Sequence, residues 1–209
     1  FPKKCLCGAL TFREENKSSK KQDAVRRCPK GYECEYTARE KLKHIVSKDA
    51  LNIDGLGKKV VDQFWSLNLI RNPADIFVIK YEKLKSLEGW GELSISNLKK
   101  SINKSKNVEL GRFIYSIGIR HIGQENAKIL ASFFKRIKNF INLADDKKRV
   151  EILKNLIELD GIGNTQVKSI DSFFSNKKNT DIVKKLIEKL NIGDFIEQNK
   201  EGKFSNKTI

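Results

Sequence analysis

The stretch LNIDGLGKKVV, residues 51–61, decides the fold because its pattern recurs along the chain. It reads apolar-x-Gly-apolar-Gly, with a further apolar residue four positions after the second glycine. The same pattern occurs in LEGWGELSI (87–95) and LDGIGNTQV (159–167). RHIGQENA (120–127) fits the same frame, with His121 at the first glycine position. The first positions of the four copies are 55, 89, 121 and 161, a spacing typical of an array of one structural unit.

Two glycines at this spacing predict a helix that ends, a tight hairpin, and a second helix. Glycine tolerates positive φ and allows another backbone to approach closely. The second helix then exposes free N–H groups and a partial positive charge, which together suit a phosphate. A lone Gly-x-Gly is usually only a helix C-cap, and single copies that only pack remain possible, but four copies in register favour helix-hairpin-helix motifs.

The residues expected to reach DNA phosphates are the hairpin positions and the polar residues that open each second helix. Such contacts hold the nucleic-acid backbone without reading its sequence. They are Gly55, Gly57, Lys58, Lys59, Gly89, Gly91, Arg120, His121, Gly123, Gln124, Lys128, Gly161, Gly163, Asn164, Thr165 and Lys168. We interpret Trp90 as a packing residue rather than a base-stacking one.

All four cysteines lie within the first 34 residues, as Cys5, Cys7, Cys28 and Cys34. Two thiol pairs in a small polar module suit a structural tetrahedral Zn²⁺, which would supply folding energy that so short a module cannot obtain from a core. One residue between Cys5 and Cys7 is tighter than the usual spacing. Disulfides are the alternative, and are disfavoured if the protein is cytosolic. A closed four-Cys site implies no catalysis.

The chain as a whole is predicted to be mainly α. A four-Cys zinc finger (1–36) is followed by an all-α array of four helix-hairpin-helix motifs (37–192). A Pro follows Asn72 and marks a further helix start. Residues 193–209 are expected to be a linker running into a truncated strand, with a frayed tail as the alternative. Three- and four-residue apolar spacing predicts helices over 38–46, 58–67, 94–102, 112–117, 127–134, 166–174 and 180–190.

Composition and charge indicate which classes of binding partner the chain could have. The chain has 209 residues and a formal net charge of +16, which suggests nucleic acid. Abundant Lys, Asn and Ile also fit an AT-rich genome, so charge alone does not decide the function. No apolar run approaches the roughly 20 residues of a membrane span, so no membrane partner is expected. Met is absent, even at position 1, so we expect a piece of a longer protein.

A four-Cys finger leading directly into four such hairpins resembles the C-terminal half of bacterial NAD-dependent DNA ligases. The resemblance runs nearly end to end. The finger departs in its one-residue Cys5–Cys7 spacing, and Ile95 stands where relatives often carry a small residue. The sequence runs that carry the resemblance are FPKKC (1–5), AVRRC (24–28), KHIVSKDALNIDGLG (43–57), NPADIF (72–77) and RFIYSIGIR (112–120).

The resemblance implies that the chain grips nicked double-stranded DNA while other domains seal the nick in replication and repair. It implies NAD and Mg²⁺ for the full-length enzyme, both bound outside this chain, and no catalytic residue within it. The chain alone is therefore expected to be inactive. Its partners in cis would be N-terminal catalytic domains and a C-terminal BRCT domain, of which 193–209 would be the beginning. The expected location is the bacterial cytoplasm, near the nucleoid.

Two other classes remain open. One is a DNA-binding scaffold of another repair complex, such as an excision nuclease subunit, against which the four-Cys finger argues. The other is a protein-interaction module whose glycines only pack helices. Tight binding of a protein partner without DNA affinity would favour the latter.

Overall fold

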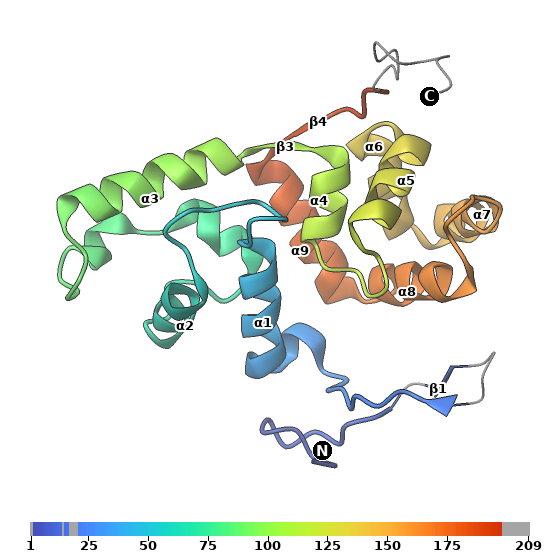
Figure 1. Ribbon diagram of the computed structural model, residues 1–209, viewed down its shortest axis with the longest axis horizontal. Helices are drawn as coiled ribbons and strands as arrows, with labels where there is room; N and C mark the ends of the chain where they lie inside the picture. Colours follow the sequence, from blue (N-terminus) through green and yellow to red (C-terminus); the bar gives the residue numbers. More distant parts are fainter. Residues whose placement is uncertain (1, 14, 17–20, 198–209) are drawn as a thin grey trace, which may run out of the picture.

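The computed structural model describes residues 2–13, 15–16 and 21–197 and shows a small finger attached to a helical body (Figure 1). The finger contains the two-residue strands β1 (Glu15–Asn16) and β2 (Lys21–Gln22), which pair antiparallel, and the 3₁₀ helix η1 (Gly31–Glu33). Helix α1 (Glu35–Ile45) leads from the finger into the body. Cys34 is the N-cap of α1, so the finger's last cysteine also begins the helical body.

The first half of the body lies to one side of α1 (Figure 1). The capping box of Asn72 and Asp75 starts η2, as the Pro after Asn72 predicted, although the helix is 3₁₀ rather than α. Its elements are α2 (Lys58–Ser66), η2 (Pro73–Val78), η3 (Tyr81–Leu84) and α3 (Glu92–Ser105).

The second half lies on the other side, and the last helix packs back against η2 of the first half. The seven predicted helices are all present, and the mainly helical fold is confirmed. The elements are α4 (Leu110–Ser116), α5 (Gln124–Phe134), α6 (Ile137–Phe140), η4 (Ile141–Ala144), α7 (Asp146–Leu156), α8 (Asn164–Phe174) and α9 (Lys177–Lys189).

The expectation of an all-α body is wrong in one detail. Strands β3 (Asn107–Glu109) and β4 (Asn191–Gly193) form a parallel pair, with Val108 opposite Ile192. Each strand has three residues and turns only the middle one toward the body. Strands this short show no alternating pattern in the sequence. The body also continues past residue 192, because the Phe195 N–H donates to the Lys135 carbonyl at 2.8 Å. The proposed start of a BRCT domain falls mostly on 198–209, outside the described residues.

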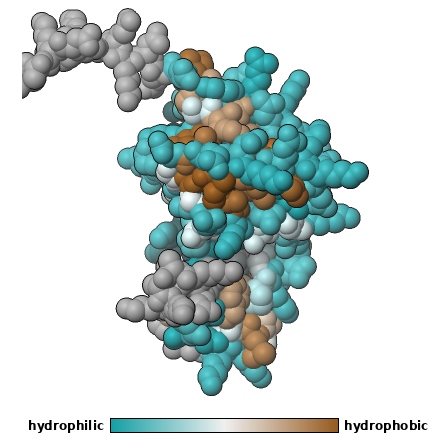
Figure 2. Space-filling model, turned by 90° about the vertical axis from the view of Figure 1, so that its right-hand side faces the viewer, coloured by the Kyte–Doolittle hydropathy of each residue, from teal (hydrophilic) through white to brown (hydrophobic). Residues whose placement is uncertain are grey.

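One hydrophobic core joins both halves. Phe140 is fully buried at its centre, with edge-to-face ring contacts to Phe134 at 5.2 Å, Phe174 at 5.4 Å and Phe113 at 6.5 Å. Such contacts add specific geometry to the burial of large apolar side chains. Hydrophilic residues cover most of the surface at the α5–α8 end, with a strip of hydrophobic residues between them (Figure 2). Within the described residues, every helix is too short or too polar to cross a membrane.

The four copies of the glycine pattern have the same backbone geometry. The first position has positive φ in every copy: +83° at Gly55, +82° at Gly89, +59° at His121 and +85° at Gly161. In each, the N–H of the next residue donates to the carbonyl three residues earlier, at 3.0–3.2 Å. His121 therefore adopts a conformation that usually belongs to glycine, and the assignment of the irregular third copy is confirmed.

The second glycine of each copy begins a helix. Gly57, Gly91, Gly123 and Gly163 are the N-caps of α2, α3, α5 and α8, all in extended conformation. Their carbonyls accept the first helical hydrogen bond, at 2.9–3.1 Å. Each unit is thus a hairpin between two helical segments, and we call the four units hairpins 1 to 4.

Alanine substitutions at the two glycines of hairpin 1 should destabilise the fold to different extents. Gly55→Ala should lower the free energy of unfolding by about 1–2 kcal/mol, because a side chain disfavours positive φ. Gly57→Ala should cost less, since Gly57 has φ −70° and no atom lies within 4 Å of the added Cβ. Urea unfolding followed by circular dichroism measures both. Equal losses would contradict the assigned geometry.

Candidate nucleic-acid interface and metal centre

The four cysteine sulfurs lie together, all within 4.8 Å of one another. The Sγ atoms of Cys5 and Cys34 are 3.7 Å apart and those of Cys7 and Cys28 are 3.6 Å apart. With Zn–S bonds of about 2.3 Å, tetrahedral geometry places sulfurs roughly 3.8 Å apart. The one-residue spacing of Cys5 and Cys7 therefore does not keep the sulfurs from converging, and the four thiols fit a closed zinc site.

Two tight turns bring the sulfurs together. The first closes on Gly8, which has φ +82° and donates its N–H to the Cys5 carbonyl at 2.8 Å. The second passes through Gly31 at φ +52° and ends where the Cys34 N–H donates to the Gly31 carbonyl. Positive φ makes glycine the natural residue at both turns. Both turns position the sulfur atoms through backbone geometry, and the second also packs Tyr32 against the hydrophobic core.

The thiols differ in acidity. Burial raises the pKa of Cys28 to about 12. Burial also raises the pKa of Cys34, but hydrogen bonds from the backbone and side chain of Thr37 outweigh it and lower the pKa to about 6. Zinc binds thiolates, so loading the site must displace the Cys28 proton.

The hairpins leave backbone N–H groups facing solvent. The N-cap glycines are exposed, and no side chain caps α2, α3 or α5. A Cβ built on Gly57 or Gly91 would meet nothing within 4 Å. At hairpin 4, the Gln166 side chain accepts from the Gly163 N–H at 3.2 Å. Open space in front of helix N-termini is the geometry that a phosphate requires.

The charges around the hairpins are unequal. Lys58 and Lys59 are exposed in the first turn of α2. Lys128 lies one turn into α5 and contacts Glu125 at 2.7 Å, and Glu92 opens α3. Exposed polar residues without charge begin α5 and α8: Gln124, Asn164 and Thr165, with Lys168 a turn later on α8.

Hairpins 3 and 4 pack as a pair through side chains. His121 Nδ1 lies 2.9 Å from the Ser169 hydroxyl, and the Asn126 amide donates to the Gly161 carbonyl at 2.8 Å. A Cβ on Gly161 would stand 2.6 Å from the tip of Ile129. Each hairpin's first position therefore packs against the second helix of its partner, an arrangement with approximate two-fold symmetry.

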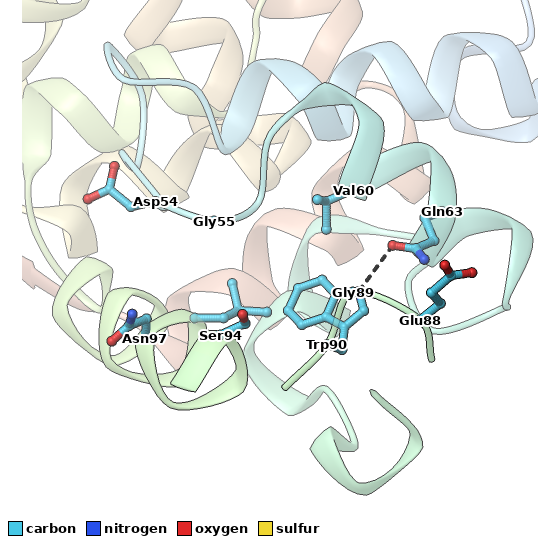
Figure 3. Close-up of a pocket in the computed structure, with 10 residues that line it drawn as sticks. Asp54, Gly55, Val60, Gln63, Glu88, Gly89, Trp90, Ser94 and Asn97 are labelled. Carbon is cyan, nitrogen blue, oxygen red and sulfur yellow. Dashed lines mark hydrogen bonds between the residues drawn. The ribbon is translucent and has the colours of Figure 1, made fainter. Parts of the chain in front are cut away.

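Hairpins 1 and 2 form the equivalent pair. Gly55 lies against Leu98 of α3, and the Trp90 indole N–H donates to Gln63 of α2 at 3.2 Å. Between them is a cavity of about 580 Å³, shown in Figure 3. The sequence predicted the packing role of Trp90, whose ring lies 5.2 Å from that of Phe64.

The finger contacts hairpin 3 through the carboxylate of Asp23, which belongs to none of the sequence motifs. Asp23 binds Arg27 at 3.0 Å and Arg120 at 3.1 Å. Backbone hydrogen bonding, first from the Val25 N–H, and the Arg27 guanidinium lower the pKa of Asp23. Burial, followed by the charges of Arg120 and Arg27, lowers the pKa of His121, which favours the neutral imidazole.

Comparisons with known proteins agree with this geometry. Residues 112–183, which contain hairpins 3 and 4, match a family model described as a helix-hairpin-helix motif. A DNA ligase of Pelagibacter ubique is 54% identical over 176 residues, covering 83% of this chain and 25% of the relative. Over most of its length, the chain is similar to one segment of DNA ligase. The expected resemblance to DNA ligases is confirmed.

Other DNA ligases match in the same way. The protein of Rickettsia bellii (strain OSU 85-389) is 44% identical over 73% of this chain and 23% of its own length. That of Parvibaculum lavamentivorans is 39% identical over 84% of this chain and 26% of its own length. The chain thus spans about a quarter of the length of these DNA ligases.

Zinc loading should follow the geometry of the thiols. Native mass spectrometry at neutral pH should show one zinc ion per chain. The Cys28→Ser variant should bind no zinc. The His121→Ala variant should keep its zinc, because His121 is of a residue type that can bind zinc but lies outside the cluster. Acidification should release the metal because protons compete for the thiolates. A zinc-supplemented chain that carries no zinc would contradict the assignment.

Proposed function

We propose that the chain is the DNA-holding segment of an NAD-dependent DNA ligase, and that it grips nicked duplex DNA without regard to sequence. The observation that carries the proposal is the fourfold recurrence of one hairpin geometry, each copy presenting the exposed N-terminus of a helix. The similarity to DNA ligases and the helix-hairpin-helix match support the same conclusion.

The proposed contacts are electrostatic and use the main chain. A phosphate oxygen accepts hydrogen bonds from the first N–H groups of a helix and interacts favourably with the helix dipole. The lysines of hairpin 1 add charge beside such a site, and the net charge of +16 attracts the duplex over a longer range. Because phosphates are the same at every base pair, this grip is independent of sequence.

The zinc ion has a structural part in this proposal. It would hold the finger's two turns together and fix the start of α1, since Cys34 is both a proposed ligand and the N-cap of that helix. Asp23 then presents its carboxylate to Arg120 beside hairpin 3. Finger and hairpins would therefore bind DNA as one surface.

The chemistry of nick sealing belongs to other parts of the longer protein in this proposal. NAD binding, adenylation and Mg²⁺ would lie in the N-terminal domains, and a BRCT domain would follow the present chain. The chain supplies no catalytic residue and would not seal nicks alone. Its setting would be replication and repair in the bacterial cytoplasm, at the nucleoid.

Binding to a nicked duplex should be strongly dependent on salt. Fluorescence anisotropy should show affinity falling by about tenfold or more between roughly 50 and 200 mM salt, because phosphate contacts release counterions. An intact duplex and a single strand are the comparison ligands. Absence of duplex binding even at low salt would contradict the proposal for this chain.

The second glycines provide a test of where the backbone is approached. Gly57→Val and Gly163→Val should each weaken duplex binding, because a branched side chain would occupy the space reserved for the phosphate. Gly193→Val, in β4 and outside the hairpins, is the matched control and should bind as the unmodified chain does. Circular dichroism verifies that each variant is folded. Unchanged binding in both hairpin variants would refute the assigned contacts.

A further inference from the structure

The two hairpin pairs differ at the place where their partners meet. In hairpins 3 and 4, that place is filled by His121 against Ser169 and by Ile129 beneath Gly161. In hairpins 1 and 2, a Cβ on Gly89 would meet nothing within 4 Å, and an open cavity of about 580 Å³ remains. The same fold therefore closes one groove and leaves the other available.

The cavity has an apolar floor and acidic ends. Val60, Leu98 and the half-buried Trp90 indole supply the floor. Asp54 and Glu88 stand at opposite ends, with Trp90 between them (Figure 3). The Gln63 side-chain oxygen accepts a hydrogen bond from the indole N–H, so Trp90 offers a ligand its ring rather than a donor.

The charge of the cavity is opposite to that of the whole chain. The lining residues include two carboxylates and no Lys or Arg, in a protein of net charge +16. Within the described part of the chain, neither Asp54 nor Glu88 forms an ion pair. The two carboxylates repel a phosphate that enters the cavity and attract a cation. Gly57, Lys58 and Gly91, at the helix N-termini proposed to meet phosphates, do not line the cavity.

We propose that this cavity binds a basic segment of a protein, with one cationic side chain at each carboxylate. The aliphatic stems of Arg or Lys would cover Val60 and Leu98, and a guanidinium or ammonium group would lie near the Trp90 ring. Charge complementarity and the position of the two carboxylates at opposite ends of the cavity, with Trp90 between them, favour an extended peptide over a single small cation (Figure 3). This inference does not rest on the proposed grip on DNA.

The indole N–H of Trp90 reports on the cavity directly. The ¹⁵N-labelled 209-residue chain has two tryptophans, and Trp90→Phe assigns their two indole signals. The probe is the capped tripeptide acetyl-Arg-Ala-Arg-amide, and its counterpart with citrulline in place of arginine keeps the shape without the charge. The arginine peptide should shift the Trp90 signal saturably, and the citrulline peptide should not.

Charge-removing variants locate the effect. The double variant Asp54→Asn, Glu88→Gln should bind the arginine peptide about tenfold more weakly, since each exposed charge pair contributes a factor of a few to the affinity. Neither carboxylate holds another described group, so the fold should persist. Glu82→Gln, an exposed acid that does not line the cavity, is the control and should leave binding unchanged.

Two outcomes would overturn the proposal. One is the absence of a saturable Trp90 shift at millimolar arginine peptide. The other is a Trp90 shift on adding duplex DNA with no response to the peptide, which would assign the cavity to the DNA surface. The anisotropy measurement of duplex binding stands apart from both, so failure of this inference and failure of the DNA-binding proposal are distinguishable.

Discussion

The structure depends on one backbone constraint, the positive φ at the first position of each hairpin. That single residue lies in the loop between a helical segment and the next helix, and its conformation lets the chain reverse within a few residues. Two positions later, a glycine in extended conformation opens the next helix and turns its N–H groups outward. His121 shows that the conformation is required rather than merely allowed, because the chain adopts it there despite a side chain. The neighbouring Ser169 hydroxyl gives that side chain a partner.

One buried polar side chain ties the two helices of hairpin 4 together. Arg149 is 7% exposed and donates to Asp171, Asp146, the Leu143 carbonyl and Ser175, which fixes α7 and α8 on both sides of hairpin 4. A guanidinium so enclosed must keep its partners, since an unpaired buried charge is costly. The ends of α7 and α8 that lie away from hairpin 4 are therefore tied together.

The sequence predicted the parts of the molecule that depend on local residue type. Glycine spacing located all four hairpins, including the copy with His121, and the cysteine cluster indicated the metal centre. It missed β3 and β4, which pair residues more than eighty positions apart and are too short to have a pattern. It also missed Asp23 and Ser169, ordinary polar residues whose importance lies in what the fold brings beside them. The open cavity was equally unpredictable, because it reflects how two hairpins fail to fill their common groove.

The junction between the two hairpin pairs determines how they can act together. Arg112 of α4 donates to the carbonyls of Lys48 and Ala50, just after α1, and His44 of α1 lies 3.0 Å from the Tyr115 carbonyl. These bonds fix hairpin 1 relative to hairpin 3 through polar contacts on top of a continuous core. Under the proposed function, sites held at a fixed separation bind a stiff duplex cooperatively, since the first contact places the others within reach. A grip made of individually weak phosphate contacts then becomes firm without any of them reading a base. The same rigidity keeps the acidic cavity of hairpins 1 and 2 in a constant position beside that surface, so a basic partner there would be placed next to the bound DNA.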